Sequence, residues 1–467
     1  MRAVVLFSVL VLSACSVGDD YARPDTPHPA TWRTDADTPE AAPTWPSATW
    51  WQRFETPSLD AVMAAAQQGN FDIAAAAARV RQADDQLRAS GAALLPSINA
   101  SAGGARSRSP FGASAGSSAT RAFVGNSFNL GLSASYEIDF WGKNRALQEG
   151  AAAASLQSRF DMRSAQLAIQ SSVAGTLFDL IGTKARLDVA RGSLVGAEKI
   201  LTALHRQRDS GLATALDETQ QESQVESQRA AIPPLEQQIA QDRNTLALLL
   251  GGMDGASFDP PERLDQIALP AIMPGLPSEL LERRPDVGSA EQQLVAANAN
   301  ITVARAQLFP DITLTGSTGF QSVDLENLAR HTALAQSIGG SLAQIIFDGG
   351  RIESQVQYSR DRYDELLAGY RKAVLSAFLD VETALTTLRK SVEEEHTQRA
   401  YAEKALQANE ISQRLLMNGM IDIVTLLNTQ RTYYAAEDTL VQARLAHLQA
   451  VLGLYRALGG GWGDSVR

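Results

Sequence analysis

The chain has 467 residues, of which 45% are hydrophobic, only 6% are aromatic and 20% are charged, and its formal net charge is −11 at pH 7. This acidity argues against a nucleic-acid partner, which would require a basic surface. The single cysteine excludes a disulfide framework and a cysteine-based zinc cluster, and the five histidines form no His-Glu-x-x-His pair, so we expect no metal site and no cofactor.

Residues 1–14 have the pattern of a lipoprotein signal peptide. A short basic start precedes the apolar run Ala3–Leu12, which is too short to span a bilayer. Small residues then precede the only cysteine, which predicts cleavage before Cys15 and lipidation of its thiol; an ordinary secretory signal is the alternative. Ser16 stands where lipoproteins kept at the inner membrane often have Asp, and this favours sorting to the outer membrane.

Residues 15–56 are expected to form a lipidated N-terminal strap. Residues 16–56 contain six prolines and four of the six tryptophans of the chain. Proline-rich sequence favours an extended path. The tryptophans indicate that the strap lies on another surface of the protein.

A helix is predicted from Pro57 to about Leu94, and the period then changes. Apolar and polar residues alternate for thirteen residues from Phe128 to Phe140, which predicts a β-strand with one apolar and one polar face. Its length exceeds the 9–11 residues that a membrane strand needs. We expect strands at about 96–105 and 124–140, joined by a Gly- and Ser-rich surface loop. The candidates for a water-filled lumen are Asn129, Ser133, Glu137 and Asp139.

A very long helix follows, from about residue 143 to Asp209, without proline. About 65 residues at 1.5 Å each give a length of roughly 100 Å, for which coiled-coil-like packing is the usual arrangement. Gly211 marks a turn, and a returning helix runs to Leu250 with a kink or break at Pro233-Pro234. Residues 251–277 form a connector.

The second half of the chain repeats the first. Residues 94–98 (LLPSI) match residues 308–312 (LFPDI) at an offset of 214, and Gly211 matches Gly419 at an offset of 208. We therefore predict a tandem duplication, with one unit at 57–250 and a second at 278–458, followed by a C-terminal tail at 459–467. Strands of the second unit are expected at about 310–320 and 335–347. Two helical repeats that are merely similar are the alternative.

Four strands cannot close a membrane barrel, because open sheet edges are not tolerated in lipid. Three chains would supply twelve strands, an even number within the range of known barrels. The predicted fold class is mainly α with a β-barrel part. In the predicted homotrimer, a 12-stranded outer-membrane β-barrel continues into a periplasmic α-helical barrel.

Several strings resemble TolC-like outer-membrane efflux lipoproteins of the NodT type, the outer membrane factors of tripartite pumps. These strings are residues 280–287 (LLERRPDV), 347–351 (FDGGR) and 425–432 (TLLNTQRT). The resemblance covers essentially the whole chain and implies the same trimeric duct, with an equatorial collar that includes residues 251–277. We expect structural roles for the Arg-Arg-Pro-Asp string and for Gly349-Gly350.

The resemblance also implies that the two helical turns form the periplasmic aperture and contact an adaptor protein. Relatives tend to have acidic residues at the constriction of the second copy, whereas the matching positions in this chain are uncharged. Simple solvated helix ends are the alternative interpretation. The candidate aperture residues are Gly211, Asp217, Gly419, Asp422, Thr425 and Asn428.

The predicted function is that of a passive exit duct for small molecules such as drugs or other toxic compounds. The chain has no Gly-x-x-x-x-Gly-Lys-[Ser/Thr] phosphate loop and no clear acid–base constellation, so it is not expected to be an enzyme. Energy would come from an inner-membrane pump of the resistance-nodulation-division (RND) type through the adaptor, and outer-membrane lipid would hold the anchor. Two alternatives are a lipid-anchored periplasmic coiled-coil scaffold and a duct for type I protein secretion.

Overall fold

The computed structural model describes residues 17–26, 31–33, 45–110, 122–272 and 277–461. Cys15 and the expected signal peptide lie outside these residues. The chain divides into two compact units. Unit 1 comprises the described parts of Met1–Pro24, Val80–Ser158 and Ala290–Tyr370. Unit 2 comprises the described parts of Asp25–Arg79, Arg159–Ser289 and Arg371–Arg467.

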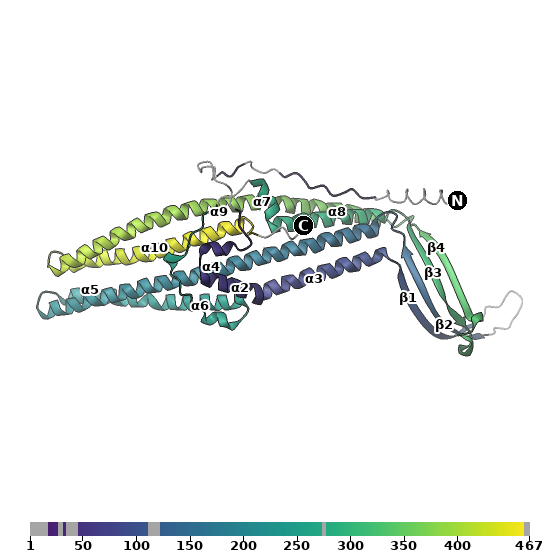
Figure 1. Ribbon diagram of the computed structural model, residues 1–467, viewed down its shortest axis with the longest axis horizontal. Helices are drawn as coiled ribbons and strands as arrows, with labels where there is room; N and C mark the ends of the chain where they lie inside the picture. The colour runs from purple at the N-terminus through teal and green to yellow at the C-terminus, as the bar shows by residue number, and fades with distance from the viewer. Residues whose placement is uncertain (1–16, 27–30, 34–44, 111–121, 273–276, 462–467) are drawn as a thin grey trace. The chain divides into compact units, whose positions relative to one another are not determined.

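Unit 1 contains a four-stranded antiparallel sheet in the order β1-β2-β3-β4 (Figure 1). Its strands are β1 (Ser97–Pro110), β2 (Ala122–Glu137), β3 (Asp311–Ser322) and β4 (Leu334–Ala343). Residues 106–110, which were expected to form a surface loop, are part of β1, and Arg106 pairs with Asn126 of β2. Backbone pairing with residues 122–126 of β2 therefore overrides the loop-like composition of this segment.

The strand register gives the sheet two chemically different faces. One row across the four strands is Asn99, Ser133, Ser317 and Ser337. The next row, on the opposite face, is Ile98, Ala134, Gly316 and Ile338. Side chains directly opposite each other on paired strands share a face. The alternation of apolar and polar side chains in β2 thus extends to all four strands. Within the described residues, the outer strands β1 and β4 each pair with a neighbour along one side only.

Two strands end earlier than expected, because the helix that follows each strand begins with a capping carboxylate. Asp139 lies beyond β2, and its carboxylate accepts hydrogen bonds from the backbone N–H groups of Asn144 at 3.0 Å and Arg145 at 2.9 Å. It therefore caps the helix that follows, and the predicted strand bounds of 124–140 were wrong at this end. Likewise β4 ends at Ala343 and not near residue 347, because Asp348 caps the next helix through three backbone N–H groups.

The helices of the first copy are interrupted at Asn70, where the sequence predicted a continuous helix, and at Ala231, beside the predicted break at Pro233-Pro234. They are α2 (Pro57–Gly69), α3 (Phe71–Gly91), α4 (Lys143–Asp209), α5 (Ala215–Ala230) and α6 (Ile232–Leu250). The single helix expected from Pro57 is interrupted at Asn70, whose Oδ1 accepts the backbone N–H groups of Asp72 and Ile73 at 2.9 and 3.0 Å. The returning helix divides at Ala231, because Pro233 and Pro234 cannot continue the helix that precedes them.

The second copy has a longer unbroken returning helix. Its helices are α7 (Pro277–Arg283), α8 (Pro285–Ala306), α9 (Arg351–Met417) and α10 (Ile423–Ala457). Short 3-10 helices occupy Trp50–Phe54, Ala92–Leu94, Met253–Ser257, Leu264–Gln266, Leu325–Asn327 and His331–Ala333. In the described part of the chain, no helix is long and apolar enough to cross a membrane.

The core of unit 2 joins both copies of the repeat through aromatic packing. The ring of Trp50 stacks on Tyr455 of α10 with centroids 5.0 Å apart, and Phe54 lies 5.1 Å from Phe178 of α4. All four side chains are buried. Part of the predicted strap lies on this unit, because Trp45 donates a hydrogen bond of 2.7 Å to Glu279.

Arg284 of the Arg-Arg-Pro-Asp string also connects elements within unit 2. Its guanidinium makes two hydrogen bonds to Asp286, of 2.9 and 2.6 Å, and reaches Asp380 of α9 at 2.9 Å. It also donates to the backbone oxygen of Ala457 at 3.2 Å. These contacts give the string a local structural role at the start of α8.

Candidate functional site

The two hairpin turns lie at one end of unit 2 and are built in the same way (Figure 1). Gly211, with φ +72°, ends α4: its N–H bonds to the oxygen of Arg208 at 2.9 Å, and the next residue, Leu212, bonds back to Gln207 at 2.8 Å. The turn around Gly419, with φ +68°, repeats both bonds 208 residues later. Glycine is required because this helix ending needs a left-handed residue, so each candidate glycine has a turn-forming role.

The acidic candidates lie at the beginnings of the returning helices. Thr214 is the N-cap of α5, and its hydroxyl accepts the N–H of Asp217 at 3.2 Å while Asp217 accepts the N–H of Thr214 at 2.8 Å. In the second copy Asp422 is the N-cap, and it accepts the N–H of Thr425 at 2.8 Å. The threonine and the aspartate have therefore exchanged positions between the copies, and each tip contains one capping carboxylate.

Asp422 is an exposed carboxylate whose bonding makes it sensitive to acid. Hydrogen bonds from Thr425 hold the pKa of Asp422 below its usual range. The stabilisation from its capping bond is thus fully present at pH values above the ordinary pKa of an aspartate. It is lost as the pH falls through the lowered pKa of Asp422, because the carboxylate then becomes protonated. Thr425 and Asn428 are also exposed and lie one turn apart on α10, so the second tip presents three neighbouring polar side chains to solvent.

Removing the first cap should loosen the first tip. We expect Thr214→Ala to destabilise the start of α5 by about 1 kcal/mol, because the N–H of Asp217 loses its acceptor. Amide hydrogen exchange in the first turn of α5 should accelerate about fivefold. Thr214→Ser retains the hydroxyl and should exchange at the wild-type rate; equal rates in the alanine and serine variants would contradict the capping role.

A buried apolar cluster holds the two hairpins together beneath the turns. It comprises Leu204 of α4 and Ile423, Leu426 and Leu427 of α10, each at most 5% exposed. At the turns themselves, Leu212 is 80% exposed and its equivalent Met420 is 67% exposed. Each tip therefore combines a packed base with an apolar side chain that is open to contact.

Farther along the hairpins, polar links connect the first copy with the second. Arg186 of α4 makes a bidentate pair with Asp438 of α10, with N–O distances of 2.6 and 3.0 Å. Arg431 of α10 donates to the side-chain oxygen of Gln224 on α5 at 3.0 Å. These four residues line a groove of about 630 Å³ between the helices. The linked residues are 252 and 207 positions apart, and no local sequence pattern predicts such contacts.

The lumen candidates in β2 share the polar face of the sheet. Asn129, Ser133 and Glu137 are separated by four residues each, so they project to the same side. Glu137 is paired with Lys143 at 2.6 Å. Asp139 does not belong to this row, because it caps α4 and its side chain is only 8% exposed.

The architecture is therefore that of a duplicated, mainly helical chain with one short sheet and two matched hairpins. The model of the outer membrane efflux protein family matches residues 62–252 and 276–460. The chain belongs to this family. It is accordingly an outer-membrane component of efflux, and its location is the outer membrane.

The relatives agree with this assignment over nearly the whole chain. The pyoverdine export outer membrane protein OpmQ of Pseudomonas aeruginosa is 40% identical over 417 residues, which cover 88% of this chain and 87% of that protein. The toluene efflux pump outer membrane protein TtgC of Pseudomonas putida is 32% identical, with 97% and 94% covered. The open state of the Neisseria gonorrhoeae MtrE outer membrane channel is similar with a TM-score of 0.86 and 27% identity, with 96% and 98% covered.

Proposed function

We propose that three copies of this chain form a passive duct through the outer membrane. The observation that carries the proposal is the open sheet: β1 and β4 each pair along one side only in the described residues. Unpaired strand edges are not stable in hydrocarbon, so β1 of one copy would pair with β4 of the next. Twelve strands would then close, with the row of Ser133 facing the water-filled lumen and the row of Ile338 facing lipid.

The long hairpins would continue the duct into the periplasm. The two repeats, proposed at 57–250 and 278–458, each supply one long helix and one return, and the connector at 251–277 would contribute to an equatorial collar. The matched tips would form the aperture, with Asp217, Asp422, Thr425 and Asn428 around it. Exposed Leu212 and Met420 support a partner at the same place, and we assign them to contact with the adaptor.

The duct would carry small molecules without catalysing a reaction. The relatives include proteins named for pyoverdine export and for toluene efflux, which indicates that different cargoes are compatible with one duct design. We therefore assign selection of the cargo, and the supply of energy, to an RND-type inner-membrane pump. The tips would open by an iris-like untwisting of the hairpins, a switch between two packed arrangements.

Membrane extraction of the full-length protein tests the trimeric barrel. We expect a heat-sensitive trimer that stays inserted in the outer membrane after Cys15→Ser, because the strands would hold it there without the lipid. A lipid-anchored scaffold would instead be released as a soluble periplasmic species by the same substitution. That result would overturn the proposal.

Reconstitution distinguishes a duct from an inserted protein without a pore. The purified trimer in planar bilayers should conduct ions in discrete steps. Cells that lack this protein but retain its pump and adaptor should accumulate small-molecule substrates of that pump. Unchanged accumulation of small molecules, together with loss of a secreted protein, would favour the type I secretion alternative.

A further inference from the structure

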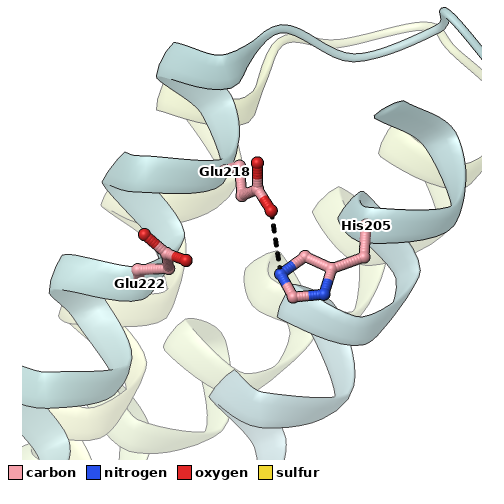
Figure 2. A group of neighbouring side chains, drawn as sticks. All are labelled: His205, Glu218 and Glu222. Atoms are coloured by element: carbon pink, nitrogen blue, oxygen red, sulfur yellow. Dashed lines mark ion pairs between the residues drawn. The ribbon is translucent and has the colours of Figure 1, made fainter. Parts of the chain in front are cut away.

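Three potential metal ligands meet near the tip of the first hairpin. His205 lies on α4, and Glu218 and Glu222 lie one turn apart on the facing side of α5 (Figure 2). One ligand atom from each residue lies within 4.8 Å of the other two. The antiparallel hairpin explains the meeting, because His205 precedes Gly211 by six residues and Glu218 follows it by seven. No other trio of such ligands is this close in the described residues.

We infer that these three side chains bind a divalent transition-metal cation such as Zn²⁺, although the sequence motifs predicted no metal site. The Nε2 atom of His205 lies 3.1 Å from Oε1 of Glu218. Two ligands at the corners of a tetrahedral zinc site, each 2.0–2.1 Å from the metal, are about 3.3 Å apart. The pair therefore already has nearly the spacing of two coordination positions. Glu222 is exposed, so its carboxylate is free to complete a third position, and water would occupy the fourth.

The type of donor selects the class of cation. An imidazole nitrogen with two carboxylates suits Zn²⁺, Co²⁺, Ni²⁺ or Cu²⁺. Mg²⁺ and Ca²⁺ prefer a shell made entirely of oxygen and should compete poorly. A hydrogen-bonded ion pair between His205 and Glu218, with no metal, is the arrangement that the test must distinguish.

Arg208 orients the central ligand. Its guanidinium pairs with Oε2 of Glu218, while Oε1 of the same carboxylate faces His205. The side chain of Glu218 is only 12% exposed, which restricts its motion. An outer-shell partner of this kind fixes a metal-binding carboxylate. With neutral His205, the two carboxylates and Arg208 sum to a charge of −1, so an incoming cation meets net negative charge.

A bound cation would join α4 to α5 close to Gly211. The ligands come from both sides of the turn, so separating the two helices would require at least one metal–ligand bond to break. This consequence goes beyond the proposed duct function and does not depend on it. It should be visible as slower amide exchange at the ends of both helices when Zn²⁺ is present.

Zinc binding to the purified full-length protein in detergent, prepared without a histidine tag, tests the site. We expect one Zn²⁺ per chain, and at least ~10-fold weaker binding after His205→Ala or Glu222→Gln, since even the loss of an outer-shell partner costs 10–100-fold. Glu222 is exposed, so its substitution should leave the fold intact. His396→Ala is the matched control, because this exposed histidine lies outside the group and should bind Zn²⁺ as the wild type does.

Two further measurements make the assignment specific. Co²⁺ should give the intense visible bands of a tetrahedral complex in the wild type and lose them in both ligand variants. Zn²⁺ should slow exchange around residues 205–222 several-fold in the wild type and in His396→Ala only. Wild-type binding no tighter than that of His205→Ala, an equal loss in His396→Ala, or displacement of Zn²⁺ by equimolar Mg²⁺ would each overturn the site.

Discussion

Arginine at position 338 is expected to prevent stable insertion of the protein into the outer membrane. Ile338 lies near the middle of β4, is 95% exposed in the single chain and belongs to the apolar row of the sheet. In the proposed barrel this row faces lipid, where Arg costs about 2–4 kcal/mol at the midplane of the bilayer. Every trimer contains three copies, so Ile338→Arg should remove most of the heat-sensitive trimer from the outer-membrane fraction.

The neighbouring residue provides a matched control. Ser337 precedes Ile338 on the same strand but projects to the opposite, polar face, where its hydroxyl oxygen lies 2.8 Å from that of Ser317. Ser337→Arg places the same charge at the same depth in the proposed lumen. We expect it to retain the trimer and to shift ion selectivity toward anions. Equal assembly of both arginine variants, or loss of Ser337→Arg alone, would contradict the proposed orientation of the sheet.

The tips show why much of this chain could be predicted from sequence. A strict offset of 208 links Gly211 with Gly419, and the structure repeats the same turn bonds at both glycines. The capping pattern was present as well, because Thr214 precedes Asp217 by three residues. Short-range backbone rules of this kind depend on few residues, and a single sequence is enough to apply them.

Other features depended on contacts that periodicity cannot encode. The sequence suggested that Asp139 continues the alternation of β2, yet its carboxylate instead satisfies the first backbone N–H groups of α4. His205 and Glu218 are thirteen residues apart on two different helices, and they meet only because the hairpin folds at Gly211. If an antiparallel hairpin with its turn at Gly211 is assumed, residues at similar distances before and after the glycine face each other. The spacing of His205 and Glu218 therefore predicts their contact, but only once the hairpin fold is known.

The largest effect expected in the helical region concerns the link between Arg186 and Asp438. This bidentate pair joins α4 of the first copy to α10 of the second, and about a third of each side chain is exposed. Such a pair contributes about 1 kcal/mol. If opening separates the two hairpins, loss of all three pairs in a trimer should shift the ratio of open to closed ducts about 100-fold. Arg186→Gln should therefore increase the open fraction in single-channel recordings.

The ion pair between Arg191 and Glu236 separates this effect from a general loss of charge. Its N–O distance is 2.9 Å, but it joins α4 to α6 within the first copy and does not cross to the second. Arg191→Gln should therefore conduct as the wild type does. Exchange of the charges, with Arg186→Asp and Asp438→Arg in one chain, should restore much of the closed state. The contrary result is an open fraction that rises equally in Arg186→Gln and Arg191→Gln. It would show that opening does not break the link between Arg186 and Asp438. The two hairpins would then have to move together during opening.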